Sequence, residues 1–392
     1  MQPNWSPHGY RIAFWANTKS TRDIWTARAA GGDPVPVTSD AAVDWSPVWS
    51  RDGRYLYFAS DRGGSMNLWR VPIDEVSGKT RGAPEQFTTP AQSSGLMSFS
   101  GDGLHMAYVA QVRDLNLYKV GFDPVREEST GESVAVTAGS TPLADPDFSP
   151  DGQSIVFNSH VTPQNLFLVR SDGTGLRQLA DGGQMDRCPR WSPDGRQITF
   201  FSARTGRFQI WTIKPDGSGM ERRTDEPGGL GARLPKWLPD GRLLYRTNGP
   251  DVIMDPAKPW KEQPLQTLPK PESGAIFAAD AWSPDGLMLA GELSRDGSFL
   301  GLAVYHADTQ RYELIGPPGP GPNARWLPDS RRLLFLREGK IHLIDSQSKR
   351  IQEVFTAGPR RNIFSFGFSS GGRWIAFTVE VAEADIWLMN LR

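Results

Sequence analysis

The sequence predicts an all-β protein, a single β-propeller with four-stranded antiparallel blades. Three observations support this class: a turn motif recurs along the chain, an aromatic residue follows most turns at a fixed distance, and a third apolar segment follows the aromatic. The turn motif occurs nine times at intervals of 42 to 50 residues. Repeats of this length with a turn in each unit are typical of propellers or solenoids. We therefore expect nine blades, or eight if a terminal unit does not form a complete blade.

The turn motif is clearest at Trp191-Ser192-Pro193-Asp194-Gly195. Proline fixes its own φ, aspartate bonds the nearby backbone, and glycine adopts a positive φ without a Cβ clash. The aromatic residue before the turn, which we call the anchor, therefore ends one strand, and the chain reverses into the next. The nine anchors are Trp5, Trp49, Phe99, Phe148, Trp191, Trp237, Trp282, Trp326 and Phe368.

Each repeat contains further strand-like segments after its turn. Seven of the nine units have an aromatic residue nine positions after the anchor, as at Phe58 and Phe200. A third segment begins with a polar and then an aliphatic residue, as at 67–69 and 209–211, and a short fourth segment follows, as at 136–137. Four short strands per unit are typical of a propeller blade.

A helical repeat is the structural alternative, and the pattern excludes it. No unit has apolar residues at i, i+3, i+4 and i+7 over ten or more positions, and 41 Gly and 32 Pro residues are too many for long helices. No linker or low-complexity tract interrupts the array, so we expect residues 1–392 to form one propeller domain. The acidic stretch 127–132 is expected to be a solvated loop.

Composition limits the partners and the compartment. The formal net charge is −1, which gives no electrostatic argument for nucleic acid or an anionic membrane. No run of eighteen apolar residues exists, so we expect no membrane insertion by this chain. The lone Cys188 forms no internal disulfide and leaves a periplasmic or a cytoplasmic location open.

Both ends of the chain lie inside the repeat pattern. Residues 3–7 already match residues 189–193, which leaves no room for a signal peptide, and the last unit stops after its third segment. We therefore hypothesise that the chain is the propeller portion of a longer bacterial polypeptide.

The anchor, the aromatic and the third segment recur in register, and this repeat resembles the WD-like repeat of the TolB propeller. It also resembles the propellers of the prolyl oligopeptidase and dipeptidyl peptidase group and the sensor arrays linked to bacterial kinases. The resemblance covers essentially the whole chain. It implies the fold and a protein-binding or sensor role, but the matching residues are structural and identify no site.

A catalytic constellation is not expected. Residues 367–371 fit G-x-S-x-G, but a nucleophile elbow leads into a helix, whereas this turn leads into a strand of the ninth unit. No Cys or His pair has zinc spacing and no calcium loop is present, so we expect neither a metal nor another cofactor. The five histidines do not occupy equivalent positions of the repeat. They are His8, His105, His160, His306 and His342.

Charged residues and one tryptophan gather where the innermost strands enter the channel. They precede the anchors of three units and are Asp44, Trp45, Asp186, Arg187 and Arg233. One interpretation is that they pair with one another and line a wet pore. The other is a polar rim for a carboxylate or an arginine-bearing peptide, since arginines suit bidentate capture of anions. The connections between strands two and three, such as 61–64 and 203–206, are expected on the same face.

Three functions remain open at this stage. The first is a non-enzymatic propeller scaffold that binds a protein or peptide partner, as the resemblance to TolB implies. The second is the substrate-gating propeller of a peptidase or hydrolase whose catalytic domain is not in this chain. The third is a metal-dependent lyase or hydrolase with a channel site, for which the sequence shows no converging set of His and carboxylates.

Overall fold

The chain folds almost entirely into β-strands, as the sequence predicts. The only helix among the described residues is the short 3-10 helix η1 (Trp260–Glu262). The computed structural model describes residues 3–18, 21–32, 34–40, 42–62, 66–88, 93–114, 116–139, 141–160, 164–180, 185–229, 231–271, 274–317, 323–359 and 361–391.

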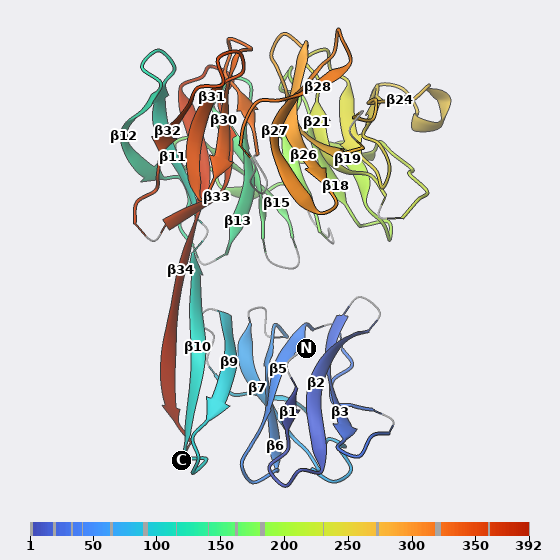
Figure 1. Cartoon of the computed structure of the whole chain (residues 1–392), viewed down its shortest axis with the longest axis vertical. Coiled ribbons are helices and arrows are strands. Elements are labelled where there is room, and N and C mark those ends of the chain that lie inside the picture. The colour runs from blue at the N-terminus through green and yellow to red at the C-terminus, as the bar shows by residue number, and fades with distance from the viewer. Residues whose placement is uncertain are drawn as a thin grey trace. The chain divides into compact units, whose positions relative to one another are not determined.

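The chain forms two compact units. Unit 1 contains residues 1–113 and 382–392, and unit 2 contains residues 114–381. Figure 1 shows the strands of both units in chain order by colour. Both units are built from antiparallel sheets, most of which have four strands that follow one another in the sequence; one larger sheet departs from this order.

Unit 1 contains three blades. The first blade has the order β1-β2-β3-β4 and the second β5-β6-β7-β8, while the third is formed by β9, β10 and the end of β34. The bounds are β1 (Asn4–Trp5), β2 (Arg11–Thr18), β3 (Thr21–Arg28), β4 (Val35–Pro36), β5 (Asp44–Trp49), β6 (Tyr55–Ser60), β7 (Asn67–Pro72), β8 (Glu85–Gln86), β9 (Ser93–Phe99), β10 (His105–Asp114) and β34 (Trp374–Asn390).

Unit 2 contains five blades made of consecutive strands. Their strands are β13 (Leu143–Phe148), β14 (Ser154–Ser159), β15 (Leu166–Arg170) and β16 (Arg177–Gln178); β17 (Arg187–Trp191), β18 (Ile198–Ser202), β19 (Gln209–Ile213) and β20 (Glu221–Arg222); β21 (Arg233–Trp237), β22 (Leu243–Arg246), β23 (Val252–Met254) and β24 (Gln266–Thr267); β25 (Ile276–Trp282), β26 (Met288–Arg295), β27 (Ser298–His306) and β28 (Arg311–Leu314); and β29 (Arg325–Trp326), β30 (Arg332–Arg337), β31 (Lys340–Asp345) and β32 (Ile351–Phe355).

A sixth blade closes unit 2 into a ring. It joins β33 (Arg361–Phe368) and the start of β34 from the ninth repeat to β11 (Leu117–Asp123) and β12 (Glu128–Ala135) from the third repeat. The innermost strands contact one another in the order β13, β17, β21, β25, β29, while β33 contacts β13 on one side and β30 and β31 on the other. Strands from distant repeats therefore complete the ring, as the two ends of a closed sheet must.

The third and ninth repeats exchange strands. The third repeat gives its first two strands to unit 1 and its last two to unit 2, whereas β34 of the ninth repeat pairs with β11 near its start and with β10 near its end. Nine repeats therefore form three blades of unit 1 and six of unit 2. This differs from the predicted single domain and from the predicted ring of nine or eight blades, so that blade number is not confirmed.

The acidic stretch around residue 127 also differs from the expected loop. Residues 128–135 are strand β12, and the half-buried Glu127 carboxylate lies 2.8 Å from the Arg332 guanidinium and also pairs with Arg350. These contacts join the closing blade to the blade of β29–β32. Adjacent blades elsewhere share apolar cores, as where Trp191 and Phe200 pack against Val156 and Leu168 of the preceding blade.

The turn motif has the hydrogen bonds that the sequence predicts. Ser192 Oγ donates to Asp194 Oδ1 at 2.6 Å and accepts from the backbone N–H of Gln197 at 2.9 Å. Gly195 has φ +70°, and its N–H donates to the Ser192 carbonyl at 2.9 Å. In the G-x-S-x-G stretch, Ser369 Oγ accepts from the N–H of Trp374 at 3.0 Å in the same way, so its hydroxyl holds a turn.

Candidate functional site

A β-bulge shapes the innermost strands of several blades before the anchor. The residue three positions before the anchor has a positive φ, as at Asp145 (56°), Cys188 (50°) and Leu234 (52°), and the strand register shifts there. A proline follows each of these residues in the sequence. Proline has no N–H for the ladder, and bulges are among the few places in a sheet that tolerate it.

The residue directly before the anchor is charged in four blades of unit 2. These residues are Asp147 on β13, Arg190 on β17, Lys236 on β21 and Arg325 on β29, and Asp280 lies one position earlier on β25. The charges of Arg190, Asp280 and Arg325 all act on the pKa of Lys236, and those of Arg190 and Lys236 act on that of Asp147. Groups from five blades that act on one another across the ring must converge near its axis. We call these five residues the channel cluster.

The cationic side chains of the channel cluster are buried and lack carboxylate partners. Arg190, Lys236 and Arg325 are 8%, 7% and 9% exposed. Among the described residues, none of the three has an ion pair within 4.0 Å, and Lys236 has no hydrogen bond from its side chain. Arg190 donates to the carbonyl of Pro189 at 2.7 Å, and Arg325 donates to that of Ala324 at 2.8 Å.

The donors of the cluster outnumber the acceptors that they can reach. Arg325 Nη2 is buried without a hydrogen-bond partner. The carboxylate of Asp147 accepts from the backbone N–H of Trp191 at 2.8 Å, and that of Asp280 accepts from the N–H of Ala324 at 3.3 Å. The carboxylates therefore accept hydrogen bonds from backbone N–H groups, whereas N–H groups of the cations are left without an acceptor. A buried donor without a partner costs free energy that an incoming acceptor recovers.

Burial and the neighbouring charges together set the protonation of the cluster. Burial opposes the charge of Arg190, but the charge of Asp147 outweighs it, and the pKa of Arg190 is raised. Burial, together with the charges of Arg190 and Arg325, lowers the pKa of Lys236 to about 8. Burial and the charge of Arg190 lower the pKa of Arg325 to about 10. Burial also raises the pKa of the Asp147 carboxyl, against the opposing effect of Arg190. An entering anion would relieve the cost of keeping these cations charged.

The cysteine beside the channel cluster is not activated as a nucleophile. Burial, with the charge of Asp145, raises the pKa of the Cys188 thiol to about 12, and a thiol rather than a thiolate is a poor nucleophile. Across the part of the chain that the structure describes, no three His, Cys, Asp or Glu side chains are grouped so as to hold a metal ion. No helix of the described residues is long and apolar enough to cross a membrane.

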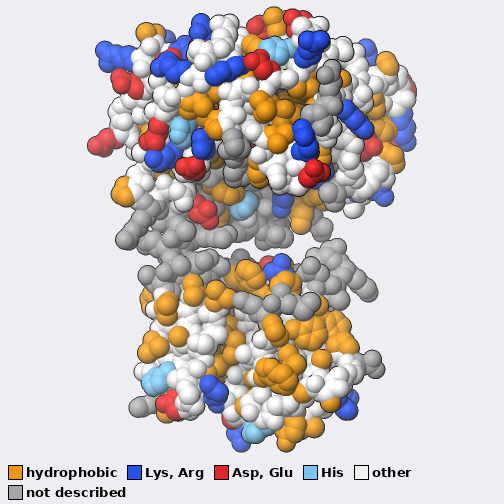
Figure 2. Space-filling model, viewed as in Figure 1, with side chains coloured by type: hydrophobic (Ala, Val, Ile, Leu, Met, Phe, Trp, Pro, Cys, Tyr) orange, Lys and Arg blue, Asp and Glu red, His pale blue; other side chains and the backbone are white. Residues whose placement is uncertain are grey.

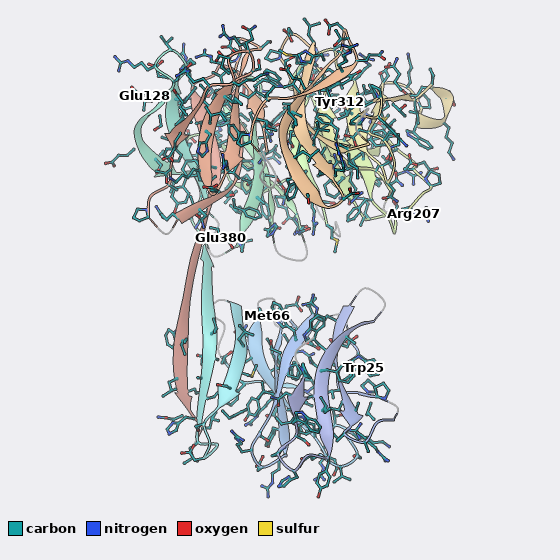
Figure 3. All side chains as sticks on the ribbon, viewed as in Figure 1. Trp25, Met66, Glu128, Arg207, Tyr312 and Glu380 are labelled. Carbon is teal, nitrogen blue, oxygen red and sulfur yellow. The ribbon has the colours of Figure 1, made fainter. Side chains whose placement is uncertain are left out.

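The five residues predicted at the channel mouth are divided between the two units. Asp44 and Trp45 belong to unit 1, whereas Asp186, Arg187 and Arg233 belong to unit 2. Trp45 is 36% exposed, and its indole Nε1 donates to the Met66 sulfur at 3.1 Å. Figure 3 labels Met66 in unit 1.

The two aspartates have the same local partner in their separate units. Asp44 is fully buried and lies 2.8 Å from the Arg62 guanidinium, and Asp186 is fully buried and lies 2.7 Å from that of Arg204. Each arginine comes from the connection between the second and third strands of the same blade. The pairing interpretation thus applies to these aspartates, although their partners are not the other mouth residues.

The two arginines of unit 2 lie on neighbouring innermost strands, four positions before their anchors. Arg187 donates to the Gln164 side-chain oxygen. Arg233 lines a cavity of about 480 Å³ together with Arg246, and its buried Nε has no hydrogen-bond partner. Burial and the charge of Arg246 lower the pKa of Arg233. These two residues lie on the same strands as Arg190 and Lys236 of the channel cluster.

Sequence reasoning named Arg187 and Arg233 on these strands but did not bring Asp147, Arg190, Lys236, Asp280 and Arg325 together as one group. The signal was present: a proline two positions before the anchor and a charge directly before it recur in three consecutive units. Recognising it requires knowing that a bulge sits at this proline.

These features define a β-propeller whose closed ring carries buried charged side chains on its innermost strands. The chain matches the family described as TolB beta propeller domain over residues 1–128 and 82–255, more than half of its length, and it belongs to that family. The confirmed parts of the prediction are the family and the four-stranded antiparallel blades.

Individual relatives match short parts of the chain. Dipeptidyl-peptidase 5 of Porphyromonas endodontalis is 40% identical over 65 residues, 17% of this chain and 9% of that protein. The Tol-Pal system protein TolB of Syntrophus aciditrophicus is 41% identical over 51 residues, 13% of this chain and 11% of that protein. The crystal structure of TolB from Acinetobacter baumannii matches with a TM-score of 0.30 and 13% identity, over 96% of this chain and 65% of that one. Each match spans less than two thirds of the relative's own length.

Proposed function

We propose that this chain is a non-enzymatic scaffold that binds a protein or peptide partner through the channel of unit 2. The partner presents a carboxylate, either a C-terminus or an acidic side chain, to Arg190, Lys236 and Arg325. The observation that carries the proposal is the set of three buried cations without ion pairs, one of which has an unfilled N–H group. Membership of the family of TolB, a protein named for the Tol-Pal system, supports a protein partner.

A carboxylate fits the channel cluster because its oxygens accept hydrogen bonds from several cations at once. Charge-assisted hydrogen bonds are about twice as strong as neutral ones, and those in a buried site are screened little by salt. In this proposal Arg187 and Arg233, on the same innermost strands, guide the acidic segment of the partner toward the cluster. The proposal concerns unit 2 alone and therefore does not include Asp44 and Trp45, which belong to unit 1.

The test uses fluorescein-labelled pools of acidic octapeptides, with a free C-terminal carboxylate in one pool and an amide in the other. We expect Lys236→Met to weaken binding by about 10- to 100-fold, since a hydrogen bond to a charged group contributes about 1.5–3 kcal/mol. Methionine has a similar length and removes a buried charge, so the fold should tolerate it. Lys214→Met, which changes an exposed lysine of the same unit, is the matched control and should bind as the wild type does.

Two further results decide the assignment. Arg187→Glu combined with Arg233→Glu should weaken binding and reduce its salt dependence, because both act on an approaching anion. If neither pool binds, or if Lys236→Met binds both pools as tightly as the wild type, the channel cluster is not the site.

A further inference from the structure

The cavity at Arg233 lies in unit 2 between the blade of β21–β24 and the blade of β25–β28, and its volume is about 480 Å³. Its lining comes from the ends of β21 and β22, from the connections 247–251 and 268–271, and from Phe277 on β25. Cavities that bind small molecules measure about 300–1,000 Å³. The volume is therefore large enough to accept a side chain of a partner.

Two arginines line this cavity, and Asp251 is the only acidic side chain among the described residues that line it. Arg233 and Arg246 are directly opposite each other in the register of β21 and β22. Asp251 lies 3.2 Å from the Arg246 guanidinium, which also donates to the Phe277 carbonyl at 3.3 Å. Arg233 has no ion pair within 4.0 Å among the described residues, and its buried Nε has no hydrogen-bond partner. The cavity therefore contains a positive charge that these residues do not neutralise.

The neighbouring blade shows what is missing at Arg233. The equivalent Arg187, also four positions before its anchor, donates to the side-chain oxygen of Gln164. Gln164 stands two positions before the aliphatic residue of a third strand, and in the blade that precedes Arg233 this position is Phe208, whose side chain has no acceptor. On the face of unit 2 that Figure 2 shows, Lys and Arg side chains lie next to Asp and Glu side chains. Arg233 lacks such a neighbour, and an entering carboxylate would supply it.

Much of the cavity wall is apolar. The rings of Phe277 and Tyr312 lie 4.9 Å apart, and Ile276 is 67% exposed. The hydroxyl of Tyr312, which Figure 3 labels in unit 2, already donates to the Pro269 carbonyl at 2.7 Å. An occupant that fits this wall has a carboxylate for Arg233 and an apolar group beside it.

The cavity and the channel cluster are within reach of one peptide. Arg233 and Lys236 lie three positions apart on β21, so their Cα atoms are about 10 Å apart, since a strand rises about 3.3 Å per residue. Burial raises the pKa of Asp251 in the cavity, and the charges of Arg246 and Lys236 oppose this rise. The charge of the cluster is thus felt inside the cavity. An extended peptide covers the same distance in about three residues.

We infer that the partner carries a second acidic residue about three positions from the carboxylate that enters the channel cluster, and that this residue occupies the cavity at Arg233. The inference rests on the proposed function and adds to it the spacing of two acidic groups on one segment. An apolar residue next to the second acid packs on Ile276 and Tyr312. Because both groups belong to one segment, the second contact forms within the complex and raises the affinity.

Fluorescence anisotropy of labelled octapeptides tests the inference. The peptides consist of Gly and Ser with a free C-terminal carboxylate, and they contain one Leu-Glu pair whose Glu is moved from one to six positions before the last residue. We expect the tightest binding with the Glu about three positions before the last residue. This peptide should bind about 10- to 100-fold more tightly than its Leu-Gln counterpart, because the Glu makes a charge-assisted hydrogen bond.

A variant of the protein assigns this advantage to the cavity. Arg233→Met should remove the preference for Leu-Glu over Leu-Gln without changing circular dichroism. Arg170→Met, which changes an exposed arginine at the end of β15 in the same unit, is the matched control and should keep the preference. The comparison of peptides on the wild type needs no protein variant, so it decides the question even if Arg233→Met does not fold.

The outcomes separate this inference from the proposed function. If Lys236→Met weakens binding but Leu-Glu has no advantage over Leu-Gln at any position, the inference is wrong and the proposed function stands. An advantage that Arg233→Met retains, or one that is equal at all positions of the Glu, also overturns the inference. If no peptide binds, or if Lys236→Met binds every peptide as tightly as the wild type, both the proposed function and the inference fail.

Discussion

Buried charged residues on the innermost strands have two kinds of environment. Asp44 and Asp186 lie five positions before their anchors, and Arg62 and Arg204 lie thirteen positions after them, so one buried ion pair occurs in both units. Breaking a buried pair from one side costs several kcal/mol, which is the expectation for a structural residue. The cations of the channel cluster lack such ion pairs, and the proposed function depends on this difference.

The lowered pKa of Lys236 predicts how stability and binding change with pH. Below pH 8 the lysine is protonated in both the folded and unfolded states; between about 8 and its unfolded value near 10.4 only the unfolded state keeps the proton. The free energy of unfolding therefore increases as pH rises through this range. Peptide binding should weaken over the same range, because the neutral amine no longer attracts a carboxylate.

Urea midpoints at pH 7.5 and 9.5 measure the stability effect as a difference between wild type and Lys236→Met. The groups acting on Lys236, namely Arg190, Asp280, Arg325 and Cys188, remain in both proteins, so the difference isolates the lysine. Equal changes of the urea midpoint with pH in the two proteins would contradict the lowered pKa of Lys236.

At the scale of the element, the turn and the anchor make separable contributions to a blade. Gly195→Val should destabilise the protein by about 1–3 kcal/mol because its φ is +70° and a β-branched residue resists it. Trp191→Ala should cost more, about 3–5 kcal/mol, through the cavity that it leaves between blades. Chemical denaturation measures both. Gly101→Val, at a turn glycine without a positive φ and with open space at its Cβ, is the control and should be nearly neutral.

The sequence predicted the elements far better than their partners. The alternation of apolar residues decides which face of a strand is buried, but equivalent strands of different repeats are interchangeable as neighbours. The exchange of strands between the third and ninth repeats therefore could not be predicted from the pattern. One signal was available: residues 109–115 and 378–385 contain no Gly, Pro, Asn or Ser, whereas other repeats have a turn there, as at 203–206. At the second of these places, β34 continues without interruption from residues of unit 2 into residues of unit 1.

The candidate site was predicted only in part for a related reason. Charges on the innermost strands are readable from the sequence, but their convergence depends on which blades share a ring. A ring of nine blades would have placed Trp45 and Arg187 around one channel, whereas they belong to different units. The pairing of Asp186 with Arg204 also needed the return of the chain from the second strand to the third, which sequence spacing alone does not give.

At the scale of the whole molecule, the residues of unit 2 are inserted in the sequence between two strands of the third blade of unit 1. Residues 114–381 contain all four strands of the closing blade of unit 2, whereas unit 1 depends on residues 382–392 for the third strand of its last blade. The backbone N–H of Leu391 donates to the Leu104 carbonyl at 2.8 Å, and Leu391 packs with the cluster of Met97 and Met106. Each unit has its own core, so we expect two unfolding transitions.

Truncation after Val381 separates the two transitions. The truncated chain keeps every strand of the ring of unit 2, so the transition of unit 2 should keep its midpoint. Unit 1 loses the strand that pairs with β10, so its transition should move to lower temperature or disappear. Differential scanning calorimetry measures both, and Val76→Ser is the control, because it removes an exposed apolar group of unit 1 and keeps the strand. A truncation that lowers both transitions equally would show that the two units unfold as one, because an independent ring has no reason to respond to the loss of residues 382–392.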